Sequence, residues 1–202
     1  MTLQNVSWDT YVSLCDADEH RRALMTYDKG TLEIMSPGRR HEEAAHIIGR
    51  MIETWTEVAG IEIAGTRSMT CRRESEQRGF EGDNSYYVTH EREMRGIREF
   101  DSEVHPPPDL VVEIDISTSS MNKLAVYESM RVPEVWLFDG HTVRAFAADQ
   151  KGKLSQVPSS RELPGFPFDQ VVPVINAAVA DGENTAIRAF RKRASTDLNR
   201  DA

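Results

Sequence analysis

The sequence predicts an α/β domain with a mixed sheet, and three neighbouring segments carry this prediction. Asp109–Asp115 is largely apolar and β-branched, which is typical of a buried central strand. Helical spacing over Met121–Met130 and a second strand pattern over Pro133–Phe138 follow it. Because the connection is long enough for a right-handed crossover, the two strands can be parallel, and antiparallel hairpins on either side would make the sheet mixed.

The N-terminal segments predict a capped helix followed by a β-hairpin. Ser7 can cap a short helix over Trp8–Leu14, because its side chain can accept a hydrogen bond from a free amide of the first turn. Strand patterns over Arg22–Tyr27 and Thr31–Met35 flank Gly30, which can adopt the positive φ that a hairpin loop needs. The hairpin would supply antiparallel strands to the domain.

A longer amphipathic helix is expected next. Apolar residues recur at helical spacing over His41–Val58, and Gly60 can end this helix. The segment Gly79–Asp83 is expected to be a turn-like entry into the strand that follows it. Short strands are expected over Ile61–Ala64, Met69–Arg73 and Asn84–Val88.

The remaining segments complete the predicted domain. His90–His105 is expected to be a polar loop with one helical turn, and Ser117–Ser120 offers capping residues for the helix after it. Later elements are a strand over Val143–Ala147, hairpin and loop over Lys151–Phe168, and helices over Val171–Val179 and Thr185–Arg193, with a frayed tail from Ala194. We expect one domain over residues 1–182, then a basic C-terminal helix and frayed tail over 183–202.

Composition and charge limit the function. The hydrophobic content of 39% and the charged content of 28% are those of an ordinary globular domain. The formal net charge of −9 argues against a protein that holds nucleic acid by general cationic attraction. A nuclease stays compatible with this charge, because a site built from carboxylates repels phosphate only until a divalent metal is bound.

The sequence also predicts a location. Cys15 and Cys71 have no CxxC spacing and are expected to be free thiols in a reducing compartment. The start of the chain, Met1–Asp9, lacks the pattern of a signal peptide. Since no apolar run approaches the ~20 residues that span a bilayer, we expect a cytoplasmic protein without a membrane segment.

Acidic side chains mark the central strand as a candidate site. By strand alternation Asp109, Glu113 and Asp115 share one face, with Glu113 roughly 6.6 Å from Asp115 and about 13 Å from Asp109. Buried acids are costly unless they are paired or bind a metal, and one ion can touch Glu113 and Asp115. In the alternative interpretation, Asp109 and Asp115 cap backbone amides or pair with arginine. Asp83 is a natural second carboxylate because it opens a strand after a glycine turn.

The sequence gives little support for other classes of catalytic site. The sequence contains no HExxH, GxSxG, P-loop or GxGxxG pattern, which argues against zinc hydrolase, serine hydrolase and nucleotide-binding classes. Nucleic-acid contacts would need local positive charge despite the acidic total, although such clusters are equally compatible with a solvated surface. The candidates are Arg39, Arg40, Arg72, Arg73, Arg95, Arg98, Arg188, Arg191, Lys192 and Arg193.

A set of motifs resembles a known family. The motifs are Phe80–Val88, Pro107–Asp115, Lys123 with Tyr127, and Val132–Trp136, in that order and spacing. They resemble the bacterial family of "putative restriction endonucleases" within the PD-(D/E)XK nuclease superfamily, over about residues 10 to 180. The resemblance implies a restriction endonuclease-like αβββαβ core, with a mixed central sheet flanked by helices, and an endonuclease that hydrolyses DNA phosphodiester bonds.

The resemblance also implies roles for particular residues. Asp83 and Glu113 match the two acids that bind Mg²⁺ or Mn²⁺, and the backbone carbonyl of Ile114 could be a further ligand. The lysine expected two residues after the second acid is replaced by Asp115, and the resemblance implies that its role has moved to Lys123 in the following helix. Lys123 would orient or deprotonate the attacking water, or stabilise the phosphorane.

The first turn of the helix that begins near residue 41 offers additional candidates. Glu42 or Glu43 could complete the site, with His41 beside them. Alternatively, these acids only balance the helix dipole.

Two other functions stay open from the sequence. One is a catalytically silent nuclease fold kept as a binding or interaction module, although intact acids and Lys123 argue against it. The other is a metal-dependent hydrolase acting on a small phosphoester. A homodimer is plausible for the nuclease, because cutting both strands of a duplex commonly needs two sites.

Overall fold

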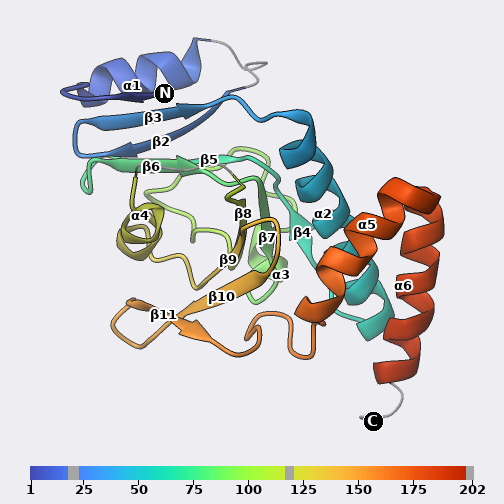
Figure 1. Cartoon of the computed structure of the whole chain (residues 1–202). Helices are drawn as coiled ribbons and strands as arrows, with labels where there is room; N and C mark the ends of the chain where they lie inside the picture. The colour runs from blue at the N-terminus through green and yellow to red at the C-terminus, as the bar shows by residue number, and fades with distance from the viewer. Residues whose placement is uncertain (18–22, 117–120, 199–202) are drawn as a thin grey trace.

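The computed structural model describes residues 1–17, 23–116 and 121–198, and it arranges them around two sheets (Figure 1). The predicted caps at Ser117–Ser120 and the first residue of the predicted hairpin, Arg22, lie outside these ranges. Among the described helices, none has both the length and the apolar character needed to cross a membrane.

The first sheet is antiparallel and carries the N-terminal hairpin. Its strand order is β1-β3-β2-β6-β5. The bounds are β1 Thr2–Leu3, β2 Leu24–Asp28, β3 Thr31–Met35, β5 Thr70–Arg73 and β6 Arg78–Glu81. The predicted hairpin is confirmed, with Gly30 at φ +95° in its loop. Helix α1 (Trp8–Asp16) lies over this sheet, and Ser7 caps it by accepting a hydrogen bond from the amide of Thr10, as predicted.

The prediction of a turn-like segment over Gly79–Asp83 is wrong for most of its length. Arg78–Glu81 is strand β6, paired between β2 and β5. Glycine suits this strand because the hydroxyl of Tyr11 in α1 packs directly on it. A Cβ at Gly79 would lie 2.2 Å from that oxygen. A glycine inside a strand often marks such a close approach, whereas sequence reasoning took it as a turn signal.

The second sheet is mixed and contains the predicted central strand. Its order is β11-β10-β9-β8-β7-β4. The bounds are β4 Ala64–Gly65, β7 Asn84–Tyr87, β8 Leu110–Ile114, β9 Glu134–Phe138, β10 Val143–Ala148 and β11 Leu154–Val157. Strand β8 pairs antiparallel with β7 and parallel with β9, so the predicted crossover through helix α4 (Lys123–Ser129) is confirmed. The strand predicted over Ile61–Ala64 shrinks to two residues.

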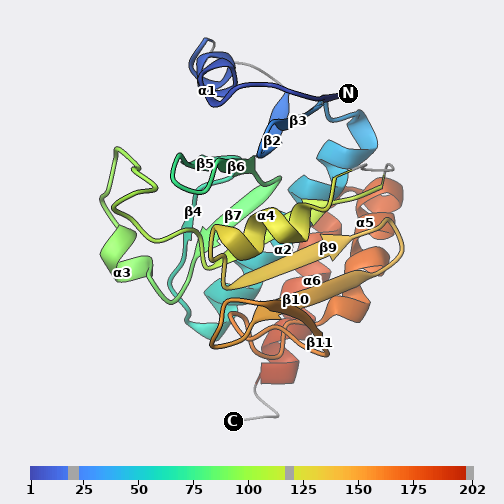
Figure 2. The ribbon, with the colours of Figure 1, turned by 90° about the vertical axis from the view of Figure 1, so that its left-hand side faces the viewer.

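Helices cover both faces of the mixed sheet, as Figures 1 and 2 show. On one face lie α2 (Arg39–Ala59), α5 (Val171–Asp181) and α6 (Glu183–Leu198), and on the other lies α4. The helical turn expected in the polar loop is α3 (Glu91–Met94), and a 3₁₀ turn over Phe168–Gln170 precedes α5. The predicted long helix and its stop at Gly60, which has φ +69°, are confirmed.

The C-terminal helix is longer than predicted. Helix α6 continues to Leu198, so the expected fraying from Ala194 is wrong for the described residues. Ala194 is 1% exposed and packs in the main core, together with Ile187 and Phe190. An ion pair between Arg191 and Glu57 further attaches α6 to α2. Burial of apolar surface therefore keeps this end of the helix ordered.

Strand β8 separates two cores, and this alternation positions the site. Leu110, Val112 and Ile114 pack in the core toward α2, α5 and α6. Val111 packs in the core toward α4. Glu113 therefore points to the α4 side, where Lys123 and Tyr127 of that helix meet it. The predicted sorting of side chains along this strand is confirmed.

Candidate active site

Asp83 and Glu113 are brought together where β6 and β7 meet β8. Asp83 lies between the two strands β6 and β7, and its Oδ2 accepts a hydrogen bond of 2.7 Å from the amide of Ile114. Gly82 allows this approach, because a Cβ there would lie 2.6 Å from Val111 Cγ1. The backbone bond thus fixes Asp83 beside the residue that follows Glu113.

Glu113 is a buried carboxylate held by two side chains of helix α4. Its side chain is 3% exposed, and Oε2 accepts a hydrogen bond of 2.8 Å from Lys123 Nζ. The hydroxyl of Tyr127 donates to Oε1. Lys123 and Tyr127 are four residues apart, so they share one face of the helix. Burial raises the pKa of Glu113, Lys123 lowers it and Asp83 raises it, and the net shift is upward.

The ammonium group of Lys123 is stabilised in its charged form. Burial lowers its pKa, but the carboxylates of Glu113 and Asp83 and the charge of Glu33 in β3 raise it, with a net upward shift. Glu33 is 8% exposed, and it is not among the site residues predicted from the sequence. Strand alternation in the hairpin could have revealed it, because an acid on the inward face of a buried strand is unusual.

One oxygen of Asp83 is buried without a partner. Its side chain is 2% exposed, and Oδ1 accepts no hydrogen bond from the described residues. His41, in the first turn of α2, places Nε2 3.2 Å from Oδ2, although the ring is not aligned for a hydrogen bond. Burial lowers the pKa of His41, but the nearby Asp83, Glu42 and Glu113 give a net upward shift.

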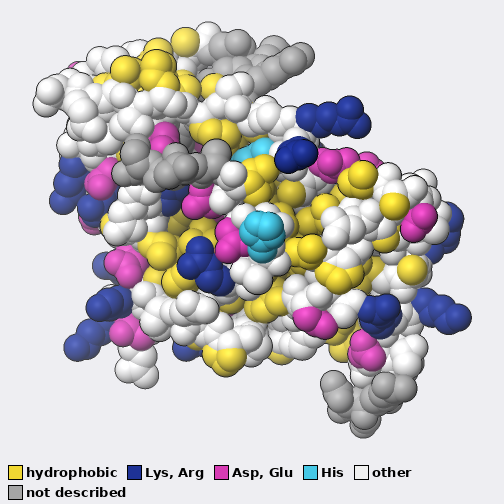
Figure 3. All heavy atoms as spheres, viewed as in Figure 1, with side chains coloured by type: hydrophobic (Ala, Val, Ile, Leu, Met, Phe, Trp, Pro, Cys, Tyr) yellow, Lys and Arg dark blue, Asp and Glu magenta, His cyan; other side chains and the backbone are white. Residues whose placement is uncertain are grey.

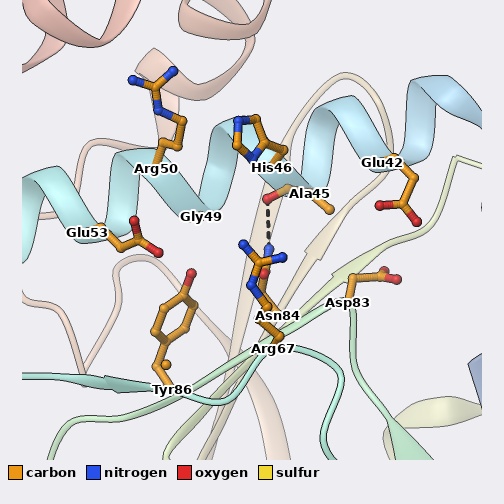
Figure 4. Close-up of a pocket in the computed structure, with 11 residues that line it drawn as sticks. Glu42, Ala45, His46, Gly49, Arg50, Glu53, Arg67, Asp83, Asn84 and Tyr86 are labelled. Atoms are coloured by element: carbon orange, nitrogen blue, oxygen red, sulfur yellow. Dashed lines mark hydrogen bonds between the residues drawn. The ribbon is translucent and has the colours of Figure 1, made fainter. Parts of the chain in front are cut away.

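Two cavities are lined in part by Asp83. One, of about 220 Å³, lies between α2 and the strands β4 and β7 (Figure 4). The other, of about 460 Å³, extends toward Ser36 and Pro37 at the end of β3. Glu42, Ala45, Arg67 and Asp83 line both. Both cavities therefore adjoin Asp83, whose carboxylate is itself buried.

The other predicted site residues fall into different surroundings. Glu42 is exposed and faces the cavities beside Asp83, whereas Glu43 lines neither of them. Asp115 is exposed and lines a separate cavity of about 150 Å³ with Glu113 and Lys123. Asp109 lies at the opposite end of β8, where it accepts hydrogen bonds from the amides of Val88 and His90.

The residues present fit a hard divalent cation with few protein ligands. Mg²⁺ is commonly held by one or two carboxylates and keeps several waters. Within the described ranges, no cluster of three or more His, Cys, Asp or Glu side chains is suited to a metal, so a dedicated cage of protein ligands is not formed. The buried unpartnered oxygen of Asp83, close to ionisable Glu113, is the kind of group that a cation would satisfy.

Sequence reasoning assigned no role to two residues that bear on this site. Tyr127 belongs to the motifs quoted for the resemblance, and its spacing from Lys123 could have indicated that both reach one acid. Arg67 had no signal in the sequence, because it is an isolated arginine that follows a two-residue strand.

The fold and the site together define a nuclease-type domain, in which a mixed sheet presents two acids next to a lysine. The chain belongs to the Uma2 family, described as "putative restriction endonuclease", whose model matches residues 8–180. The resemblance inferred from the sequence is confirmed by this match. A search of curated proteins gave no match.

A solved structure agrees with the predicted fold class. The chain is similar to a crystal structure of a "putative nuclease belonging to DUF820" from Anabaena variabilis ATCC 29413. Sequence identity is 16%, the TM-score is 0.59, and the match covers 84% of this chain and 99% of that chain. This likeness shows the fold, and the family supports a nuclease in general terms.

Proposed function

We propose that this protein is a metal-dependent endonuclease that hydrolyses DNA phosphodiester bonds. One observation carries the proposal. The buried oxygen of Asp83 that has no partner lies near Glu113, which is itself paired with Lys123. Asp83 and Glu113 would hold Mg²⁺ or Mn²⁺, with the carbonyl of Ile114 as a further ligand. The ion would lower the pKa of a bound water and neutralise charge on the phosphate.

The protein's own groups have distinct tasks in this proposal. Lys123 is ion-paired with Glu113, so it offers positive charge and N–H donors that suit orienting water and stabilising charge on the phosphorane. Tyr127 fixes the direction of the Glu113 carboxylate by donating to its other oxygen. The amide of Ile114 does the same for Asp83. These bonds pre-organise the acids before substrate binds.

The setting of the enzyme is also part of the proposal. Cys15 and Cys71 are buried free thiols, which fits a reducing compartment such as the cytoplasm. A homodimer stays a prediction, based on the need to cut two strands.

A cleavage assay tests this function. The pure protein is incubated with supercoiled plasmid and with single-stranded DNA in Mg²⁺, Mn²⁺ or EDTA, beside Lys123→Ala. Lys151→Ala is the matched control, because Lys151 is an exposed lysine in the turn between β10 and β11. We expect cutting only with metal, lost in Lys123→Ala and kept in the control. Metal-independent cutting, or equal cutting by Lys123→Ala, would contradict the assignment.

The alternative of a silent binding module makes a different prediction. Such a protein would bind DNA with the same dependence on the acids but would leave it intact in either metal. The intact pairing of Glu113 with Lys123 and Tyr127 argues for the enzyme, because a binding module has no need to hold a partly buried lysine against a buried acid. Nucleotide substrates in the same assay separate DNA cleavage from hydrolysis of small phosphoesters.

A further inference from the structure

Arg67 is the cationic residue common to the two cavities beside Asp83. Four residues line both cavities, and the other three are Ala45 and the acids Glu42 and Asp83. Arg50 also lines the smaller cavity, but its guanidinium is bonded to Glu183 and Asn184 of α6. Figure 4 shows Arg67 extending from its loop toward α2, in the space that leads to Asp83.

The backbone of Arg67 is held in an unusual conformation. Its φ is +51°, in the left-handed region that non-glycine residues seldom adopt. Two bonds to β7 hold the loop there. Ser85 Oγ donates to the carbonyl of Arg67 at 2.7 Å, and the amide of Thr66 donates to the carbonyl of Ser85 at 2.8 Å. Strain that is kept in place by the surrounding structure is concentrated at functional sites.

The guanidinium of Arg67 is free to take a ligand. Arg67 is exposed, and its guanidinium makes no hydrogen bond or ion pair with the described part of the chain. Several other arginines are occupied, such as Arg72 with Asp16, Arg78 with Asp28 and Arg95 with Glu91. On the face shown in Figure 3, basic side chains lie in small separate groups among acidic ones. This face therefore shows no broad basic surface, and a phosphate bound on it would be held by individual cations.

We propose that Arg67 binds a backbone phosphate of the nucleic-acid strand, next to the phosphate that is cleaved at Asp83. This inference rests on the proposed function and names a positioning residue for it. The lining of the smaller cavity includes three acidic residues, Glu42, Glu53 and Asp83, whose carboxylates repel phosphate. A planar guanidinium can hold a phosphate through two parallel hydrogen bonds, which fixes direction as well as position. The strand would then run along the groove between α2 and the loop of Arg67.

The test compares three substitutions in a Lys123→Ala background, so that DNA is bound in Mg²⁺ without being cut. Arg67→Asn removes the charge with the residue that best tolerates a left-handed backbone, after glycine. Arg67→Lys keeps the charge but loses the planar fork. Arg144→Asn is the matched control, because Arg144 is exposed on β10, which β9 and β8 separate from β7, and lines neither cavity.

Binding of a labelled oligonucleotide is measured by fluorescence anisotropy at several salt concentrations. We expect Arg67→Asn to weaken binding about tenfold, with Arg67→Lys in between and the control unchanged. The slope of log K against log salt should fall by about 0.9 for duplex and about 0.7 for single-stranded DNA. Equal behaviour of Arg67→Asn and Arg144→Asn, or an unchanged slope, would overturn the proposal.

Two further arms separate the ways in which the idea can fail. Inorganic phosphate is added at constant ionic strength, and we expect it to compete poorly. If it displaces the oligonucleotide efficiently from the Arg67 protein but not from Arg67→Asn, the residue belongs to a site for free phosphate and not for a strand. If the protein with Arg67 intact binds no DNA at all, the proposed function fails, and the assignment of Arg67 fails with it.

Discussion

Two buried acids at opposite ends of β8 have very different partners. Asp109, just before the strand, is completely buried and accepts hydrogen bonds of 2.7 and 2.9 Å from the amides of Val88 and His90. Its other oxygen contacts His90 Nδ1 at 2.5 Å. Glu113, near the other end, is 2% exposed and is held by side chains of one helix, next to an acid with an unpartnered oxygen.

The comparison shows that the partners of a buried acid, and not its burial, indicate its role. Backbone amides are fixed by the fold, so their hydrogen bonds to Asp109 attach β8 to the loop before α3. Glu134 is a second example, since one of its oxygens accepts from the backbone amides of Arg161 and Glu162. Among the described residues, no backbone amide donates to Glu113, and Asp83 adds negative charge to its surroundings that a cation would relieve.

The largest expected effect separates the two acids by activity. Glu113→Gln should lower metal-dependent DNA cleavage by about a hundredfold or more, because it removes a charge needed at the site. Asp109→Asn should retain most of the cleavage activity per folded molecule. Initial rates on supercoiled plasmid, normalised to the folded fraction by circular dichroism, measure this. Similar losses in both variants would remove the distinction.

Stabilisation by bound metal should also distinguish an acid of the candidate site, Asp83, from Asp109. In the presence of Mg²⁺ or Mn²⁺ at 100 times its dissociation constant, the free energy of unfolding should rise by about 2.7 kcal/mol. The rise should persist in Asp109→Asn and disappear in Asp83→Asn, which removes a proposed ligand. Urea unfolding with metal and with EDTA measures it. A rise that survives in Asp83→Asn would place the ion elsewhere.

Stability should show the reverse pattern, with a somewhat smaller effect. Asp109→Asn weakens hydrogen bonds between backbone amides and a buried charge, which we expect to lower the free energy of unfolding by about 2 kcal/mol. Glu113→Gln should cost less, because burial disfavours the ionised form of this side chain in the folded protein. Urea unfolding of both variants without metal is the measurement. A greater loss in Glu113→Gln would reverse the interpretation.

The smallest effect concerns how the stabilisation by the contact between His90 and Asp109 depends on pH. The hydrogen bond to Asp109 raises the pKa of His90, burial opposes the shift, and the charge of Asp109 adds to it. Because the pKa is higher in the folded state, the stabilisation is fully present below the unfolded value of about 6.5 and is lost as pH rises through the folded value. The His90 side chain is 39% exposed, so screening keeps the effect small.

A matched variant isolates this contribution. The difference in unfolding free energy between the native sequence and His90→Gln should be larger at pH 5.5 than at pH 8. A difference that grows with pH would contradict the assignment of His90 to Asp109.

Local sequence patterns were enough to predict most of the helices and strands and to nominate the acids of the candidate site. Helix caps and glycine stops act through neighbouring residues, so Ser7 and Gly60 behaved as predicted. The apolar pattern of β8 was strong enough to indicate its burial and its parallel partner, and strand alternation separated Glu113 from the apolar residues of the opposite face. The β6 strand was missed because Gly79 reflects a contact with Tyr11, which is distant in sequence.

Which charged residues lie close together depends on the tertiary structure. Nothing in the spacing of Asp109, Glu113 and Asp115 shows that the first binds backbone amides and that the last is exposed. The placement of Arg67 beside Asp83 likewise depends on bonds between its loop and β7. Local preference is encoded over a few residues, whereas a charge acquires its role from partners that distant segments bring within a few ångströms.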